Sequence, residues 1–176
     1  MPVSMPVFML GSKLAFCPEG RDWQRRLLLA RLSAELFLGV GSPLYGAMYR
    51  EGLIGPGFHA DVTDFPAGGV CWASGRAADP QAVLGRIVDA AERLEADRET
   101  EERFRRIRKA MQGNFIMALD SFDSLCHTQA DGHFLGWDGM DAPAVAEGLQ
   151  PEEAVSFLKE AFRADRLALS VVKPLD

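Results

Sequence analysis

The sequence predicts an α+β domain in which helices pack on a mostly antiparallel sheet. Two apolar periods alternate along the chain. Residues 58–63 and 166–173 alternate apolar and polar side chains, which is the period of a half-buried strand. Residues 102–125 instead repeat apolar side chains at steps of three and four, the period of one buried helix face. Proline or glycine stands at most boundaries between such segments, which favours short, separate elements.

The predicted elements run, in order, strand, two helices, two strands, three helices and strand. Three polar residues mark helix starts, because their side-chain oxygens can accept hydrogen bonds from the unpaired N–H groups of a first turn. These predicted caps are Asp22, Ser42 and Asp79, and a proline follows the second and the third. The predicted strands are 7–16, 58–63, 70–74 and 166–173, with a turn at 66–69, and the predicted helices are 23–38, 44–51, 80–94, 102–125 and 151–162.

Two segments are predicted to lack regular structure. Residues 1–6 contain Pro2 and Pro6, which cannot donate hydrogen bonds to a sheet, so we expect a connector there. Residues 131–143 are rich in glycine and aspartate, which predicts an irregular loop. With no internal repeat and no second region of distinct composition, residues 1–176 are expected to form one domain.

The helix predicted at 102–125 is expected to lie at the centre of the fold. Gly113 falls inside its apolar pattern, at a cost of about 1 kcal/mol relative to alanine. A glycine in such a place often allows a neighbour to pack closely against the backbone, so we predict close packing at Gly113. The simpler alternative is a long core helix that tolerates the glycine. The apolar stripe consists of Phe104, Ile107, Met111, Phe115, Ala118, Phe122 and Leu125.

Composition excludes several classes of function. The 176 residues carry a formal charge of −6, which argues against a nucleic-acid surface, because phosphate neutralisation needs a basic face. No apolar run of about 18 residues is present, so no membrane span is expected. The cysteines Cys17, Cys71 and Cys126 are widely spaced and odd in number, which predicts buried free thiols in a reducing, cytoplasmic compartment.

The search for catalytic motifs returns none. The chain lacks a glycine-rich phosphate loop, a dinucleotide-binding fingerprint and a zinc-peptidase histidine motif. Cys126, His127, Asp131 and His133 lie close together in sequence and are metal-ligating types, but no pair has the spacing of a structural zinc site. We therefore expect no metal ligands and no catalytic residues, and we treat Cys126 with His127 as a remote nucleophile–base alternative.

Two tyrosines suggest a contact surface on the second predicted helix. Tyr45 and Tyr49 stand four residues apart, so they share one helix face, and Arg50 follows them. Tyrosine is favoured where a ring is buried in a contact while its hydroxyl stays wet. These residues are therefore candidates for contact with a substrate or a partner. Packing of both rings on the domain's own core is an equally weighted alternative.

Several stretches resemble the C-terminal domain of insulinase/pitrilysin-type zinc peptidases, above all the bacterial processing-peptidase-like branch. Each motif is short, but they follow the family's order over nearly the whole chain. Phe58, just beyond the third of them, joins the candidate contact residues. The matching stretches are 5–11, 41–45, 49–54, 111–115 with 119–122, and 169–174.

This resemblance implies a specific role. Such peptidases pair an N-terminal domain, which carries the zinc motif, with a C-terminal domain of similar fold that has no zinc ligands. The halves enclose a chamber for unfolded peptides. The chain is then expected to be the non-catalytic domain, excised from a longer two-domain protein whose other half holds the zinc. Its implied partners are that catalytic domain, a peptide substrate and, as a further option, a second peptidase-like subunit, with neither nucleic acid nor membrane among them.

The chain departs from the family at one point. In active relatives a similar helix carries an arginine and, beyond a Gly-Leu step, a tyrosine that contacts the peptide. Gly55 occupies the tyrosine position here, and Arg50 is out of phase with the expected arginine. The alternative function is therefore a stand-alone binding or assembly module of the same fold, without proteolytic activity.

Overall fold

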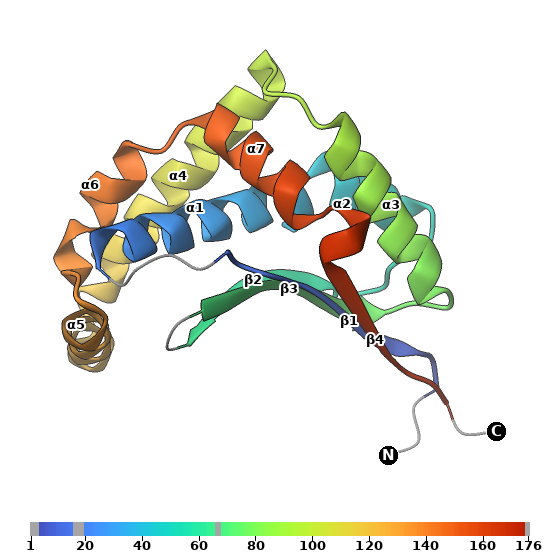
Figure 1. Cartoon of the computed structure of the whole chain (residues 1–176), viewed down its shortest axis with the longest axis horizontal. Coiled ribbons are helices and arrows are strands. Elements are labelled where there is room, and N and C mark those ends of the chain that lie inside the picture. Colours follow the sequence, from blue (N-terminus) through green and yellow to red (C-terminus); the bar gives the residue numbers. More distant parts are fainter. Residues whose placement is uncertain (1–3, 16–19, 66–67, 175–176) are drawn as a thin grey trace.

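The computed structural model describes residues 4–15, 20–65 and 68–174. It contains a four-stranded antiparallel sheet with a layer of helices over one face (Figure 1). This architecture confirms the predicted α+β class. The strand order is β2-β3-β1-β4, so the first strand along the chain lies inside the sheet and the last lies at its edge.

The sheet forms much as its alternating sequences predict. The strands are β1 (Val7–Lys13), β2 (His59–Phe65), β3 (Gly68–Arg76) and β4 (Leu167–Val172). Strand β1 pairs with β3 on one side and with β4 on the other, and Leu10 faces both Ala73 and Leu169. Within the turn predicted at 66–69, Gly68 and Gly69 instead belong to β3. Residues 66–67 lie outside the described residues, as does residue 16 of the predicted first strand.

Helix α1 (Arg21–Leu38) is the core helix and packs against β2, α4, α6 and α7. The prediction that Asp22 caps it is wrong. The helix starts two residues earlier than predicted, with Gly20 in the cap position, and Asp22 lies in the first turn, where its charge still favours the helix dipole. The stretch Arg21–Arg50 is long and apolar enough, by length and composition, to cross a membrane, but 56% of its apolar window is buried inside the domain.

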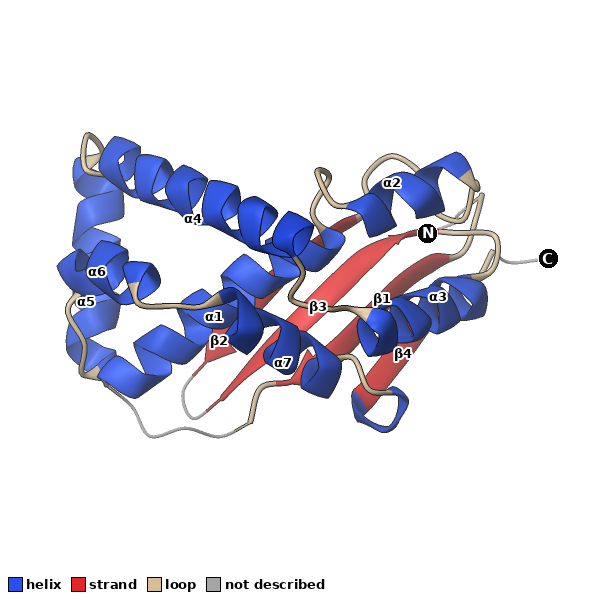
Figure 2. Cartoon of the chain, turned by 90° about the horizontal axis from the view of Figure 1, so that it is seen from above, coloured by secondary structure: helices blue, strands red, loops and turns tan. Residues whose placement is uncertain are grey.

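The other predicted caps are confirmed. Ser42 Oγ accepts a hydrogen bond from the N–H of Tyr45 (3.0 Å) and begins α2 (Pro43–Arg50). Asp79 accepts from the N–H groups of Gln81 and Ala82 and begins α3 (Pro80–Arg93). Figure 2 shows α2 and α3 at the same end of the sheet, next to the strand ends where the described chain starts and finishes.

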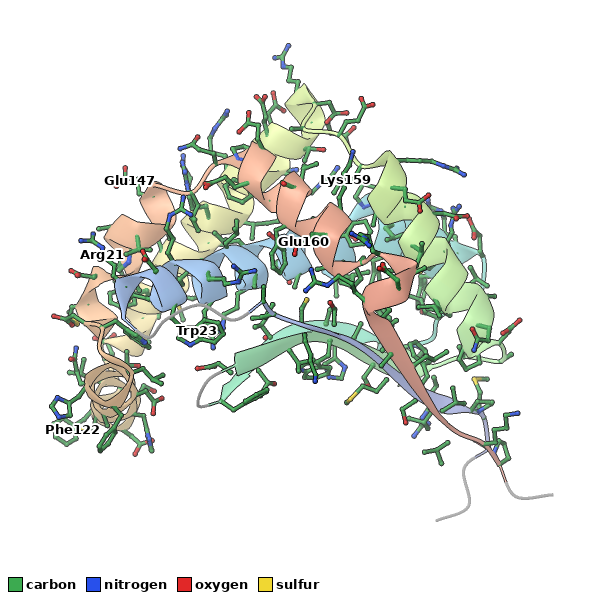
Figure 3. All side chains as sticks on the ribbon, in the orientation of Figure 1. Arg21, Trp23, Phe122, Glu147, Lys159 and Glu160 are labelled. Atoms are coloured by element: carbon green, nitrogen blue, oxygen red, sulfur yellow. The ribbon has the colours of Figure 1, made fainter. Side chains whose placement is uncertain are left out.

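The long helix expected at 102–125 is divided in two. Helix α4 (Arg98–Ala118) ends before the predicted boundary, and α5 (Phe122–Leu135) starts anew with Ser121 as its cap. Only the first part of the stripe enters the core: Phe104 is buried, and Ile107 and Met111 pack partly against it. Phe122 is 81% exposed, so the buried stripe predicted to continue through residue 125 is wrong. Figure 3 shows Phe122 on the outer side of α5.

The prediction for Gly113 is also wrong. Gly113 is exposed, and a Cβ atom added there would meet no atom within 4 Å. The reason is that Gly113 lies on the outward side of α4, whereas the half-buried Met111 and Phe115 lie on the side that faces α1.

The loop predicted at 131–143 is mostly helical. The segment contains the end of α5, the 3-10 turn η1 (Gly139–Asp141) and the start of α6 (Ala142–Glu147). Its glycines serve close packing: a Cβ atom at Gly132 would lie 2.5 Å from the carbonyl oxygen of Trp137. Helix α7 (Pro151–Ala161) and the turn η2 (Ala164–Arg166) then lead into β4, as the sequence predicts for the final helix and strand.

The two described cysteines differ. Cys71 is buried and free, as predicted, and burial together with the negative charge of Asp61 raises the pKa of its thiol to about 12. Cys126 lies exposed on α5, so the prediction that it is buried is wrong. Cys17 falls outside the described residues, as do residues 1–3 of the predicted connector.

Candidate functional site

The sheet has one covered face and one bare face. Helices α1, α3 and α7 lie above it, and among the described residues no helix lies beneath it (Figure 1). The pleat sends Phe8 and Leu10 into the covered side, where both are buried. The intervening residues point to the bare side, and several of them are large and apolar. Met9 is 49% exposed, Phe65 48% and Val172 57%.

Trp72 lies near the middle of this bare face and is held in place by β2. Its indole N–H donates to Thr63 Oγ1 (2.9 Å). The ring of His59 meets the indole edge-on, with centroids 5.1 Å apart. Cross-strand contacts of this kind restrict the rotamer of a large side chain, so the half-buried Trp72 presents a fixed aromatic surface.

A row of aromatic rings leads from the core to the surface of α2. Phe8 contacts Phe58 (centroids 6.2 Å apart), Phe58 contacts Tyr45 (6.0 Å), and Tyr45 stacks on Tyr49 (6.1 Å). Gly75, opposite Phe8 in the sheet, makes room for Phe58, because a Cβ atom at Gly75 would lie 3.1 Å from that ring. The outermost ring therefore rests on a stack that is anchored in the sheet.

The predicted contact residues lie at different depths along this row of rings. Phe58 is 3% exposed, so it supports Tyr45 from within the core and offers no surface of its own. Tyr45 is half-buried against the core, whereas Tyr49 is 50% exposed and Arg50 is exposed. Helix α2 contacts α1 and α3, so these side chains lie with the helical layer and not under the bare face. Their contact with a substrate or a partner stays a prediction.

Gly55 lies in the connection between α2 and β2. Its carbonyl oxygen accepts from the N–H of Phe58 (3.3 Å), and a Cβ atom added there would meet nothing within 4 Å. The fold therefore leaves space at the position where active relatives are expected to carry a tyrosine. Crowding by neighbouring atoms therefore does not explain why the chain lacks a tyrosine at this position.

The four residues considered as metal ligands lie on α5. His127 Nε2 is 3.7 Å from Asp123 Oδ1, in an exposed pair within one helix. Across the described chain, no three His, Cys, Asp or Glu side chains are grouped as a metal site would require. The donor set therefore does not fit a zinc ion in these parts of the chain.

Sequence reasoning missed the bare face as a site. The signal was present in β1, where residues 7–10 are all apolar, although a strand with one solvated face should alternate. Apolar side chains at successive positions predict two apolar faces. The periodicity alone does not say that the helices cover only one of them.

A groove lies on the helical side of the domain. A groove of about 390 Å³ separates the distal half of α4 from α1 and α6, with Leu27, Phe115 and Ala146 among its lining residues. None of the predicted contact residues lies there. The groove exists because α4 diverges from α1 toward its C-terminal end.

Comparison with known proteins agrees with the resemblance seen in the sequence. No protein-family model matches the chain. The uncharacterised zinc protease YmfH of Bacillus subtilis (strain 168) is 26% identical over 159 residues, which cover 88% of this chain and 36% of that protein. The chain therefore spans about a third of the length of this curated relative.

Solved structures share the fold over the whole chain. A protein described as an M16-like peptidase, from Alicyclobacillus acidocaldarius, has a TM-score of 0.86 at 26% identity, covering 99% of this chain and 42% of its own. The inactive peptidase domain of a zinc protease from Bordetella parapertussis has a TM-score of 0.81 at 12% identity, covering 100% and 94%. The chain is thus similar in sequence and in fold to part of an M16-like peptidase and in sequence to part of a zinc protease, and it shares the fold of an inactive peptidase domain.

Proposed function

We propose that this chain forms the non-catalytic half of a chamber that encloses unfolded peptides in an insulinase-like zinc peptidase. The bare face of the sheet is its part of the wall. The observation that carries this proposal is the exposure of the large apolar side chains Met9, Phe65 and Val172 on that face, which also holds the fixed ring of Trp72.

The chemistry of the bare face suits an extended, unfolded peptide. Its apolar side chains can bury apolar side chains of many sequences, because hydrophobic contact has no directional requirement. His59 and Asp61 on β2 add polar groups at one margin. Such a wall retains a peptide without choosing a single sequence, which is what an enclosing half requires.

The zinc in this proposal belongs to the partner half. The described residues of this chain offer no fitting donor set, and the curated relative extends well beyond the matched region. The partners we propose are therefore a zinc-bearing catalytic domain and an unfolded peptide. Tyr49 and Arg50, exposed at the end of the aromatic row, are candidates for the seam with that domain.

The test introduces charge on the bare face. The chain is combined with the zinc-motif domain of its natural protein, or of the neighbouring gene, and cleavage of a fluorogenic peptide is measured. Met9→Asp with Val172→Asp is expected to lower cleavage by about tenfold or more. The control is Phe134→Asp on α5, which introduces a charge at an exposed apolar residue (80%) away from the bare face. If the two variants cleave the peptide at equal rates and keep the melting temperature of the unchanged protein, the bare face is not part of the chamber wall.

A stand-alone binding module is the second candidate, and the closed core favours it. Buried residues of the sheet, α1, α3 and α7 form one cluster without any contribution from a partner. Under either candidate, the isolated chain is expected to cleave no peptide and to hold no stoichiometric zinc after dialysis. Zinc that binds at one equivalent and is lost in His127→Ala with His133→Ala would contradict this and point back to α5.

A further inference from the structure

The groove between α1, α4 and α6 plays no part in the chamber wall proposed above. It lies on the helical side, at the end of the molecule opposite α3 (Figure 2). Its volume of about 390 Å³ falls within the range of pockets that hold small molecules. Leu27 and Leu28 of α1, Phe115 of α4 and Ala146 of α6 give it mostly apolar walls. Such walls suit the apolar body of a small ligand.

Hydrogen bonds between the surrounding elements hold these walls in place. Arg108 of α4 donates to the carbonyl oxygens of Glu147 and Leu149 (3.0 and 3.1 Å), which fixes α4 against the chain that follows α6. The N–H of Gly20 donates to the carbonyl oxygen of Leu135 (2.8 Å), which ties the start of α1 to the end of α5. The groove is therefore formed before any ligand arrives, as binding pockets usually are.

Gln24 of α1 leaves an acceptor without a partner in this groove. The side chain lines the groove and is only 3% exposed. Its Nε2 donates to the carbonyl oxygen of Asp138 (2.8 Å), and because a carbonyl can only accept, this bond fixes the orientation of the amide. Its Oε1 is buried and has no hydrogen-bond partner among the described residues. A buried acceptor in this state requires a donor, since leaving it unpaired costs stability.

Trp137 leaves a donor without a partner at the same end of the groove. It precedes Asp138, the residue that holds Gln24, and it also lines the groove. Its indole Nε1 is buried and, within the described parts of the chain, bonds to no acceptor. An indole N–H can only donate. A group that both donates and accepts, such as a primary amide, supplies what these two atoms lack.

The charges of the groove favour a neutral ligand. Its charged lining residues are Arg31, Asp64 and Asp131. Arg31 pairs with Asp64 (3.2 Å), so the carboxylate of Asp131 remains as the excess charge. A negative potential at the rim opposes the approach of an anion. A carboxylate would also offer no proton to Gln24 Oε1.

We propose that this groove binds a small neutral molecule with an apolar body and a terminal amide-type group. The N–H of that group donates to Gln24 Oε1, and its oxygen accepts from Trp137 Nε1. The apolar body lies between α1, α4 and α6. Because the groove and the bare face lie on opposite sides of the sheet, this site does not depend on the chamber function.

The first test compares three probes of nearly equal shape, which are 3-phenylpropanamide, 4-phenylbutan-2-one and 3-phenylpropanoate. They are titrated into the 176-residue chain at pH 7, and the indole N–H signals of its three tryptophans are followed by NMR, with Trp137→Phe identifying one of them. The amide is expected to bind with a dissociation constant of about 1 mM or tighter and to shift the Trp137 signal. The ketone cannot donate and the carboxylate is charged, so each is expected to bind at least about tenfold more weakly.

Two results of this titration would overturn the proposal. If the amide does not bind at about 20 mM, water alone satisfies the two buried atoms. If the amide and the ketone bind equally well, apolar contact alone accounts for the binding. A shift of the Trp137 signal with the expected order of affinities supports the site.

The second test places the binding in the groove. Ala118 and Ala110 are both exposed alanines of α4, but only Ala118 lines the groove. Ala118→Phe is expected to weaken amide binding about tenfold, because the ring occupies part of the space, and Ala110→Phe is the matched control that should leave it unchanged. Undiminished binding to Ala118→Phe would place the probe elsewhere and overturn the proposal.

A third variant tests the hydrogen bond to Gln24. Gln24→Met keeps the length of the side chain and removes the acceptor, so the amide and the ketone are expected to bind it equally. An amide that keeps its tenfold advantage in this variant would overturn the assigned contact. Melting temperatures show whether each variant is folded, and if Gln24→Met does not fold, the Ala118→Phe and Ala110→Phe pair decides.

Discussion

Helix α1 and the α4–α5 pair carry similar apolar patterns but differ in burial. Leu32 and Leu36 of α1 are buried between the sheet and the other helices. On α4, Phe104 is buried to the same degree, but later members of the same stripe are not: Ala118 is exposed, and Phe122 in α5 is 81% exposed. In the described chain, the last side-chain hydrogen bond from α4 to another element is that of Arg108 to the carbonyl oxygens of Glu147 and Leu149.

This difference shows what an apolar period can establish. Residues at steps of three and four define a helix face, and they do so equally in α1 and in α4. Burial requires a second surface at the matching distance, and only α1 has one along its whole length. The following predictions test how far the stability of the domain depends on the packed region alone.

The largest expected effect is a cavity in α1. Leu32→Ala is expected to lower the free energy of unfolding by about 2–5 kcal/mol, because Leu32 is fully buried and the site can collapse only partly. Ile116→Ala on distal α4 is expected to change it by no more than about 0.5 kcal/mol. Urea denaturation of both variants measures the difference. Similar losses would mean that distal α4 is covered in solution.

Gly132 is the exception within α5, and its substitution is expected to have the next largest effect. A Cβ atom there would lie 2.5 Å from the carbonyl oxygen of Trp137, so the backbone of the following turn has to move. Gly132→Ala is expected to destabilise the domain by about 1–3 kcal/mol. A melting temperature equal to that of the unchanged protein would show that α5 and this turn already move independently.

Gly113 provides the opposite case on α4. Because an added Cβ meets nothing within 4 Å, alanine gains helix propensity without a clash. Gly113→Ala is expected to stabilise the domain by about 0.4–1 kcal/mol. Gly113→Leu should also be tolerated, as the position is exposed. A lower denaturant midpoint for the leucine variant would reveal a neighbour that packs against this helix.

The smallest effect concerns ion pairs. Arg25 of α1 donates to both carboxylate oxygens of Glu153 on α7 (2.7 and 2.8 Å). Burial raises the pKa of Glu153, but the hydrogen bond from Arg25, the hydrogen bond from the N–H of Gln150 and the charge of Arg25 together outweigh it and leave that pKa below its ordinary value. In α4, by contrast, Glu102 pairs with Arg98 of its own helix on an exposed surface.

The pH dependence of Glu153→Gln follows from this direction. A lowered pKa contributes stability above the unfolded value, about 4.3, and that stability is lost as the pH falls through the folded value. We therefore expect the variant to be less stable by under about 1 kcal/mol at pH 6, and the difference to shrink as the pH falls below about 4.3 and through the lowered folded value. Glu102→Gln is the control and should show a smaller difference. A gap for Glu153→Gln that does not shrink as the pH falls would exclude the ionised carboxylate as its source.

Much of the fold could be predicted because its signals are local. Ser42 with Pro43 and Asp79 with Pro80 set two helix starts through hydrogen bonds within a single turn. The alternation of apolar and polar residues predicted the strands, and the family resemblance predicted the class of domain. The predictions for Gly113, Phe122 and Cys126 were wrong because each depends on what lies opposite α4 and α5, and the sequence of those helices does not contain that information.

The candidate site shows the same division. The sequence by itself determined that β1 is apolar on both faces, that β4 is uncharged and that Tyr45 and Tyr49 share a helix face. The tertiary structure alone decided that the helices cover one face of the sheet, that β2 and β4 are its edges, and that Phe58 supports the tyrosines from within. Backbone hydrogen bonds and periodicity are fixed by residues a few positions apart, whereas burial is fixed by segments that meet only when the chain has folded.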